Sequence, residues 1–177
     1  SKRSIKNLDL TNKRKNAWGT GLIFNHAIDS IQNVTVAAGF TREISENANN
    51  TSYYRNAYGL GLAYNFVHTT YGLDLERQVT KNQGDKRTKN EVRAIVRQGL
   101  NEDWNVYAMY AYKTDKQFGD TDRTRQFMVG TEYYVYNQGS LKVKPFLEWQ
   151  ATRTKYENST VDRSRDFKTV IGLRAYW

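Results

Sequence analysis

The strongest constraint on the fold is an alternation of apolar with polar or small residues that has a period of two. In residues 58–66 the large apolar side chains are Tyr58, Leu60, Leu62, Tyr64 and Phe66, and the residues between them are Gly59, Gly61, Ala63 and Asn65. Successive side chains of a β-strand point to opposite faces of the sheet. The pattern therefore predicts a strand with one apolar face and one small or polar face.

The same alternation ends the sequence. In residues 166–177 one register holds Phe167, Thr169, Ile171, Leu173, Ala175 and Trp177. The other register holds Asp166, Lys168, Val170, Gly172, Arg174 and Tyr176. We therefore expect a last amphipathic strand that finishes on an aromatic residue. Such an ending resembles the C-terminal strand of bacterial outer-membrane β-barrels.

The alternation recurs along the whole chain. It predicts nine strands from Trp18 onward and a tenth near Leu8 and Leu10, with residues 12–15 as a loop and no helix. The predicted connections are short at residues 28–31, 67–70, 100–103 and 137–140, and long at residues 46–52, 81–90, 114–124 and 153–165. Transmembrane barrels have short periplasmic turns and longer extracellular loops. We expect an all-β, antiparallel, up-and-down transmembrane β-barrel of about ten strands, formed by residues 1–177 as one domain.

Alternation alone does not say whether the apolar face meets lipid or a packed interior. Mean hydropathy is -0.81 and no apolar run is long enough for a membrane helix, but barrel strands average each apolar residue with a polar neighbour. Aromatic residues gather at the ends of the apolar faces, as in the interfacial girdles of membrane proteins: Trp18, Tyr58, Phe66, Tyr71, Trp104, Tyr112, Phe127, Trp149, Phe167 and Trp177. These positions favour lipid. A soluble barrel with the apolar set inside is the alternative.

With these strands and turns in place, the chain resembles the small monomeric outer-membrane porins that take up acidic sugars, namely the oligogalacturonate-specific porins and the sialic-acid channel. The resemblance covers roughly residues 17–177. It rests on the hairpins in a chain of 20.6 kDa, the Asn-Glu-Asp-Trp turn at residues 101–104, the inward Arg and Lys residues and the aromatic end. It implies a monomer that passes acidic oligosaccharides, and twelve strands, two of which would precede Ser1.

The formal charge of +9 predicts an anionic partner. The cations of the inward register are Arg93, Arg97, Lys113, Lys142, Lys144, Lys168 and Arg174, and the acids there include Asp74, Glu76, Glu91, Glu132 and Glu148. These cations could line a pore and draw small anionic solutes through it. They could also pair with the acids and fill the lumen, which would leave a structural or adhesive barrel. Small residues on the early strands and bulky ones on the later strands favour an off-centre pore.

The chain offers little for catalysis. It has no Cys, and its two histidines, His26 and His68, fall beside short turns in the outward register. We expect no enzyme activity, no catalytic residue, no metal site and no cofactor. A soluble, basic β-barrel that binds nucleic acid is a remote alternative, because most aromatics share a register with aliphatic residues while most cations take the other. We instead expect a location in the bacterial outer membrane, with basic loops and the N-terminal segment contacting lipid and lipopolysaccharide phosphates.

Overall fold

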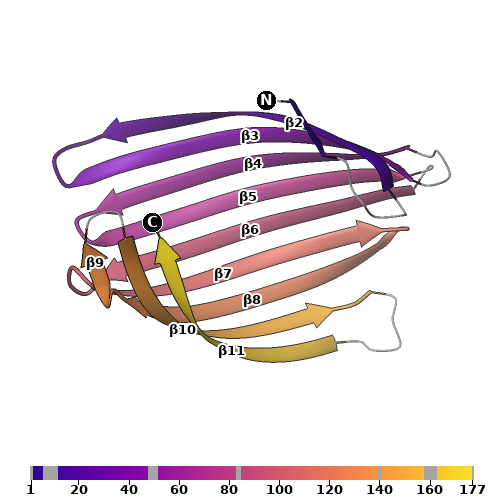
Figure 1. Ribbon diagram of the computed structural model, residues 1–177. Helices are drawn as coiled ribbons and strands as arrows, with labels where there is room; N and C mark the ends of the chain where they lie inside the picture. Colours follow the sequence, from indigo (N-terminus) through magenta and orange to yellow (C-terminus); the bar gives the residue numbers. More distant parts are fainter. Residues whose placement is uncertain are drawn as a thin grey trace.

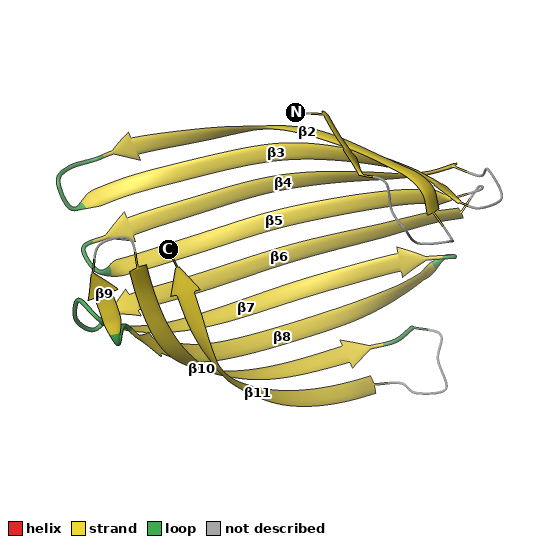
Figure 2. Ribbon diagram, viewed as in Figure 1, coloured by secondary structure: helices red, strands yellow, loops and turns green. Residues whose placement is uncertain are grey.

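The computed structural model describes residues 2–5, 12–47, 52–82, 85–138, 141–157 and 163–176. Their regular structure is all β-strand, joined in a single antiparallel sheet (Figure 2). These residues contain no helix that is long and apolar enough to cross a membrane.

Nine long strands lie side by side in chain order (Figure 1). They are β2 (Asn12–Ala27), β3 (Gln32–Asn47), β4 (Ser52–Phe66), β5 (Thr69–Asn82), β6 (Asp85–Gly99), β7 (Trp104–Gln117), β8 (Asp120–Tyr133), β10 (Leu141–Lys155) and β11 (Arg163–Tyr176). Two short strands extend the described sheet: β1 (Lys2–Ile5) pairs with β2, and β9 (Tyr136–Gln138) pairs with β10. The predicted all-β, antiparallel, up-and-down arrangement is therefore confirmed.

The described strands form an open sheet rather than a closed barrel. The order runs from β1 and β2 at one edge to β11 at the other, and no pairing between described residues joins these edges. A barrel closes only when its first and last strands exchange hydrogen bonds. The strand expected near Leu8 and Leu10, and the terminal Trp177, lie outside the described residues.

The short connections at one end of the sheet are largely as predicted. Residues 28–31, 67–68 and 100–103 join consecutive long strands. In the last of these, the Oδ1 of Asn101 accepts hydrogen bonds from the backbone N–H groups of Asp103 (3.0 Å) and Trp104 (2.8 Å). Such bonding by an Asn side chain stabilises a chain reversal. The turn predicted at residues 137–140 is wrong in its first half, which belongs to β9, and residues 139–140 lie outside the described ranges.

The loops predicted at the opposite end are mostly wrong, because the strands continue into them. Residues 81–82 and 85–90 belong to β5 and β6, and residues 12–15 belong to β2. Only Phe118 and Gly119 connect β7 to β8, with φ of 52° and 94°. Two residues with positive φ suit the twist of a tight β-hairpin. The ends of β10 and β11 likewise extend into the predicted loop at 153–165.

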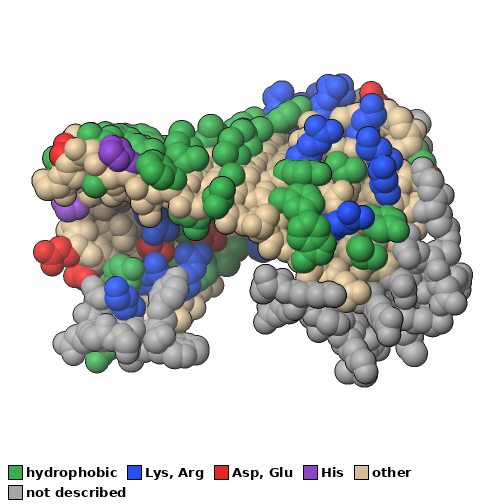
Figure 3. Space-filling view, turned by 90° about the horizontal axis from the view of Figure 1, so that it is seen from above, with side chains coloured by type: hydrophobic (Ala, Val, Ile, Leu, Met, Phe, Trp, Pro, Cys, Tyr) green, Lys and Arg blue, Asp and Glu red, His purple; other side chains and the backbone are tan. Residues whose placement is uncertain are grey.

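The two faces of the sheet carry different side chains. The outward register of every long strand exposes large hydrophobic residues, including Leu22 (80% exposed), Leu62 (45%) and Ile171 (80%). The inward register holds the buried Glu132 and Lys144. Figure 3 shows hydrophobic side chains over the convex surface and charged ones in the hollow beneath it. The apolar register is therefore the exposed one, opposite to its place in a soluble barrel.

Candidate functional site

The concave face of β6 to β11 carries a group of interacting charged side chains, called here the charged wall: Arg93, Arg97, Lys113, Glu91, Glu132, Glu148, Lys144 and Arg174. All belong to the inward register of their strands. Adjacent strands lie about 4.8 Å apart, so side chains from three or four strands can meet on one face. The period-two pattern of each strand thus assembles the group.

Glu132 on β8 is the centre of the charged wall. Its carboxylate accepts contacts from Arg97 Nη1 (3.0 Å), Lys144 Nζ (3.0 Å) and Arg174 Nη1 (3.2 Å). The side chains of Glu132 and Lys144 are 0% and 6% exposed. A buried carboxylate is tolerated only when it is paired and hydrogen-bonded. The three cations come from β6, β10 and β11, so this one acid ties four strands together.

A second acid, Glu148 on β10, joins the same group. Its Oε1 lies 2.6 Å from Arg174 Nη2 and accepts a hydrogen bond of 2.6 Å from the Tyr107 hydroxyl. The guanidinium of Arg174 also stacks over the Phe146 ring, 4.0 Å from its centroid. These contacts hold the Arg174 side chain in one orientation, since the carboxylate and the ring restrain the planar guanidinium together.

Glu91 on β6 forms a smaller cluster with Arg93 Nη2 at 2.8 Å and Lys113 Nζ at 3.3 Å. Asp74 on β5 approaches Arg93 Nη1 at 3.8 Å. These pairs connect β5, β6 and β7. The charged wall therefore consists of two clusters on the concave face, this one on β6 and β7 with Asp74 of β5 beside it, and the one around Glu132 and Glu148.

The cations and acids of the charged wall differ in exposure. The side chains of Arg93, Arg97, Lys113 and Arg174 are 34–42% exposed, whereas those of Glu91, Glu148 and Glu132 are 20%, 16% and 0% exposed. Asp74, at 55%, is the exception. Except in the pairs Lys144–Glu132 and Arg93–Asp74, each pair buries most of its acid and leaves part of its cation in solvent. Around Glu132 and Glu148, the charge that reaches the solvent is mainly that of Arg97 and Arg174.

All seven cations named from the sequence lie in the inward register. Five of them enter ion pairs: Arg93, Arg97, Lys113, Lys144 and Arg174. Lys142 and Lys168 are exposed and form no ion pair with a described residue. The sequence did not decide whether these cations pair with inward acids, and the structure shows that most of them do.

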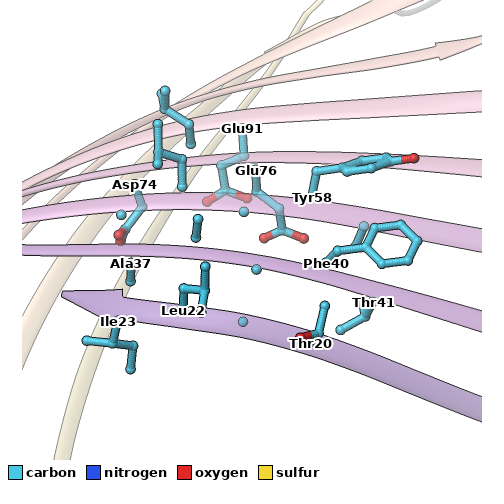
Figure 4. Close-up of a pocket in the computed structure, with 18 of the residues that line it drawn as sticks. Thr20, Leu22, Ile23, Ala37, Phe40, Thr41, Tyr58, Asp74, Glu76 and Glu91 are labelled. Carbon is cyan, nitrogen blue, oxygen red and sulfur yellow. The ribbon is translucent and has the colours of Figure 1, made fainter.

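The opposite part of the concave face is lined by small residues. A hollow of about 620 Å³ there is bordered by Gly21, Gly39, Gly59 and Gly61 on one side and by Asp74, Glu76, Glu91 and Arg93 on the other. Figure 4 shows the carboxylates of Asp74, Glu76 and Glu91 beside this hollow. A Cβ added at Gly59 would meet no atom within 4 Å and one at Gly39 would come no closer than 3.8 Å, so these two glycines leave open space next to the charged wall.

Sequence reasoning missed an ion pair at the far end of the strands. Arg87 on β6 makes hydrogen bonds of 2.8 and 2.5 Å to Asp115 on β7, and Lys89 lies 3.7 Å from the same carboxylate. The hydrogen bond from Arg87 lowers the pKa of Asp115, and the same bond raises the pKa of Arg87. The sequence pattern predicts loops at both positions. Arg87 lies an even number of residues from Glu91 on β6, and Asp115 lies an even number of residues from Lys113 on β7, so both point to the inward face. This spacing is the signal that could have revealed the pair.

Sequence reasoning also missed a set of outward cations at this end of the sheet: Arg123, Arg125, Arg153, Lys155, Arg163 and Arg165. They continue the register of the apolar residues on β8, β10 and β11, as the strand pairing shows. The statement that cations mostly avoid the aromatic register is therefore wrong for these strand ends.

The structure offers no arrangement typical of metal binding in its described residues, where no group of three or more His, Cys, Asp or Glu side chains could hold an ion. His26 stacks on Phe24, with ring centroids 6.3 Å apart. The chain matches no protein-family model and no curated protein.

Proposed function

We propose that the protein is a bacterial outer-membrane channel that passes small anionic solutes, acidic oligosaccharides in particular, along the charged wall. The observation that carries this proposal is the exposure of the wall: four of its five cations, all but Lys144, reach the solvent, and the acids Glu91, Glu132 and Glu148 lie mostly beneath them. A diffusing carboxylate would therefore meet guanidinium and ammonium groups first.

The convex face supports a place in a membrane. Exposed hydrophobic residues on all nine long strands make one continuous apolar surface, far more than a soluble monomer commonly exposes. On β4 this stretch runs from Tyr58 to Phe66, nine residues, and a tilted strand of about 9–11 residues crosses a bilayer. Lipid would cover the apolar surface, with Tyr58 and Phe66 near its two boundaries.

Insertion also requires that both edges of the sheet be paired. Unpaired backbone groups are costly in hydrocarbon, so only a closed barrel of strands can span a bilayer. We therefore propose that β2 and β11 are joined in the inserted protein, either to each other or through further strands.

The proposed transport mechanism depends on the ion pairs that fix the arginine side chains of the charged wall. A guanidinium has five N–H donors, and an acid beneath it occupies only some of them. In Arg97 and Arg174 the remaining donors are available to a carboxylate in the lumen, because these side chains are 42% and 34% exposed. Pairing keeps each arginine in place and weakens its attraction for a solute. Weak, repeated sites allow a solute to enter and also to leave.

A structural or adhesive barrel is the second candidate, and the pair Glu132–Lys144 favours it. Both side chains are buried, so this pair meets no solute and serves only to join β8 to β10. If all the wall charges acted in this way, the lumen would be closed.

Planar-bilayer recording separates the two candidates. We expect the wild-type protein to conduct and to prefer anions in a KCl gradient. The variant R93Q/R97Q should lower this preference while keeping the fold, because Glu91 retains Lys113 and Glu132 retains Lys144 and Arg174. The matched control R77Q/K81Q removes two cations from the outward register and should leave the preference unchanged.

Absence of conductance from correctly folded protein would refute the channel and favour the structural barrel. Conductance with an ion preference that R93Q/R97Q does not alter would refute the role of the charged wall.

A further inference from the structure

Six cations form two rows across the outer surface of β8, β10 and β11. In the first row Arg125 pairs with Arg153, which pairs with Arg165. In the second row Arg123 pairs with Lys155, which pairs with Arg163. Directly paired residues of antiparallel strands point to the same face. These six side chains, called here the cation grid, therefore project together from the convex face.

The cation grid brings like charges close together. With strands about 4.8 Å apart and alternate residues about 6.6 Å apart, the six backbone positions fit within roughly 10 Å by 7 Å. This is about one Debye length at physiological salt, so solvent ions screen the repulsion only in part. Like charges placed directly opposite each other destabilise a sheet. An anion bound among these cations would relieve their repulsion.

Protein groups do not supply that anion among the described residues. None of the six cations enters an ion pair there. The acids of the same strand ends, Asp120, Asp122 and Asp166, occupy the inward register. Glu157, which follows β10, accepts a hydrogen bond from the Thr121 backbone N–H instead. The strands thus separate positive charge outward from negative charge inward.

The cation grid lies directly beyond the apolar surface. The row next to Arg125, Arg153 and Arg165 consists of Phe127, Ala151 and Phe167. Trp149 packs against both phenylalanines, with ring centroids 6.4 and 6.1 Å away. Five of the grid cations and Tyr112 border a cavity of about 260 Å³. A ligand in this cavity would lie among these cations and against Tyr112, one residue row away from Phe127 and Phe167.

We propose that the cation grid binds the phosphate groups of an anionic membrane lipid, whose acyl chains lie on the adjoining apolar surface. The proposal rests on the membrane insertion proposed above. A phosphate monoester carries about -1.5 to -2 charges at pH 7, and the fork of an arginine matches two of its oxygens. A lipid joins phosphate to hydrocarbon as the protein joins the grid to its aromatic row. A free phosphate or a nucleic acid lacks the hydrocarbon.

The test compares vesicles of phosphatidylcholine that contain lipid A with vesicles that contain dephosphorylated lipid A. Reconstituted wild-type protein should retain lipid A through detergent extraction and bind the dephosphorylated form far less. In R125Q/R153Q/K155Q the affinity should fall on the order of 100-fold, since each cation near an anionic surface contributes about 1 kcal/mol. The control R77Q/K81Q/K86Q removes three outward cations of β5 and β6 and should weaken binding less than about tenfold.

The other outcomes each contradict the proposal. If R125Q/R153Q/K155Q and R77Q/K81Q/K86Q lost affinity for lipid A equally, binding would depend on the overall surface charge and not on a site. Displacement of lipid A by inorganic phosphate at equal phosphate concentration would identify a free-anion site, and stronger binding of single-stranded DNA by the same cations would identify a nucleic-acid site. Insertion is scored separately by protease protection in pure phosphatidylcholine. Inserted protein without phosphate-dependent binding refutes the lipid site alone, whereas failure to insert refutes the membrane channel as well.

Discussion

At the scale of single residues, Glu132 shows how a buried charge can be the most connected point of a sheet. It was one of several inward acids in the sequence, and nothing in its neighbours along the chain marks it. Its importance comes from Arg97, Lys144 and Arg174, which lie 12 to 42 positions away and converge on its carboxylate. Breaking a buried ion pair at one partner leaves the other charge without compensation.

We therefore predict that Glu132→Gln lowers the free energy of unfolding by roughly 3 to 5 kcal/mol, because Lys144 stays buried without its carboxylate. The measurement is denaturant unfolding in detergent. The matched control Glu102→Gln changes an exposed acid of a turn and should shift stability by less than about 0.5 kcal/mol. Similar small shifts for both variants would show that the Glu132 contacts are not a source of stability.

At the scale of the strands, aromatic side chains of one strand cover glycines of the next. A Cβ added at Gly130 on β8 would lie 2.5 to 2.7 Å from atoms of the Tyr107 ring on β7, and one at Gly172 would lie 2.6 Å from Phe146. On the later strands bulky residues thus fill the space above glycines. At Gly59 on β4 the space stays open. Glycine has different roles on the two parts of the concave face.

This difference predicts opposite outcomes for one kind of substitution. Gly130→Ala should displace the Tyr107 ring, disturb its hydrogen bond to Glu148 and cost about 1 to 3 kcal/mol of stability. Gly59→Ala should be neutral or stabilise by about 0.5 to 1 kcal/mol, because a strand glycine loses more conformational freedom than alanine. The measurement is the denaturant midpoint of unfolding of each variant, compared with that of the wild-type protein. Equal stabilities would contradict the packing of Tyr107 against Gly130.

Strand length is the element-scale property that the sequence predicted least well. The apolar alternation ends near Phe127 on β8 and Ala151 on β10, but the strands continue to Asp120 and Lys155. Hydrophobic periodicity reports the face that avoids water and not the backbone hydrogen bonding that defines a strand. Where Arg and Lys replace apolar residues in the outward register, the pattern disappears while the pairing persists. The cation grid lies in this region, and the sequence pattern predicts loops at all of its positions except Arg125.

At the scale of the molecule, the proposed membrane location can be tested on the exposed apolar surface of the convex face. In water, a charged residue on that face would be tolerated. In a bilayer it costs about 2 to 4 kcal/mol near the midplane. Leu62 and Ala63 are adjacent on β4 and occupy opposite registers, so they provide a matched pair.

We predict that Leu62→Arg strongly reduces the folded fraction in phosphatidylcholine vesicles, whereas Ala63→Arg is tolerated because it points to the concave face. The folded fraction can be measured from the heat-dependent migration of the protein in SDS gels. Equal tolerance of both variants would show that lipid does not cover the convex face.

The sequence by itself determined the all-β class, the position of three short turns and the face on which each strand residue lies. These properties are local, because the alternation of side chains follows from the backbone of a single strand. The tertiary structure decided which inward charges pair, how far each strand continues and which strands form the edges of the described sheet, β1 and β11. Those properties depend on the register between strands, which brings residues such as Arg97 and Glu132 together across the sheet. A pattern read along one strand contains no information about that register.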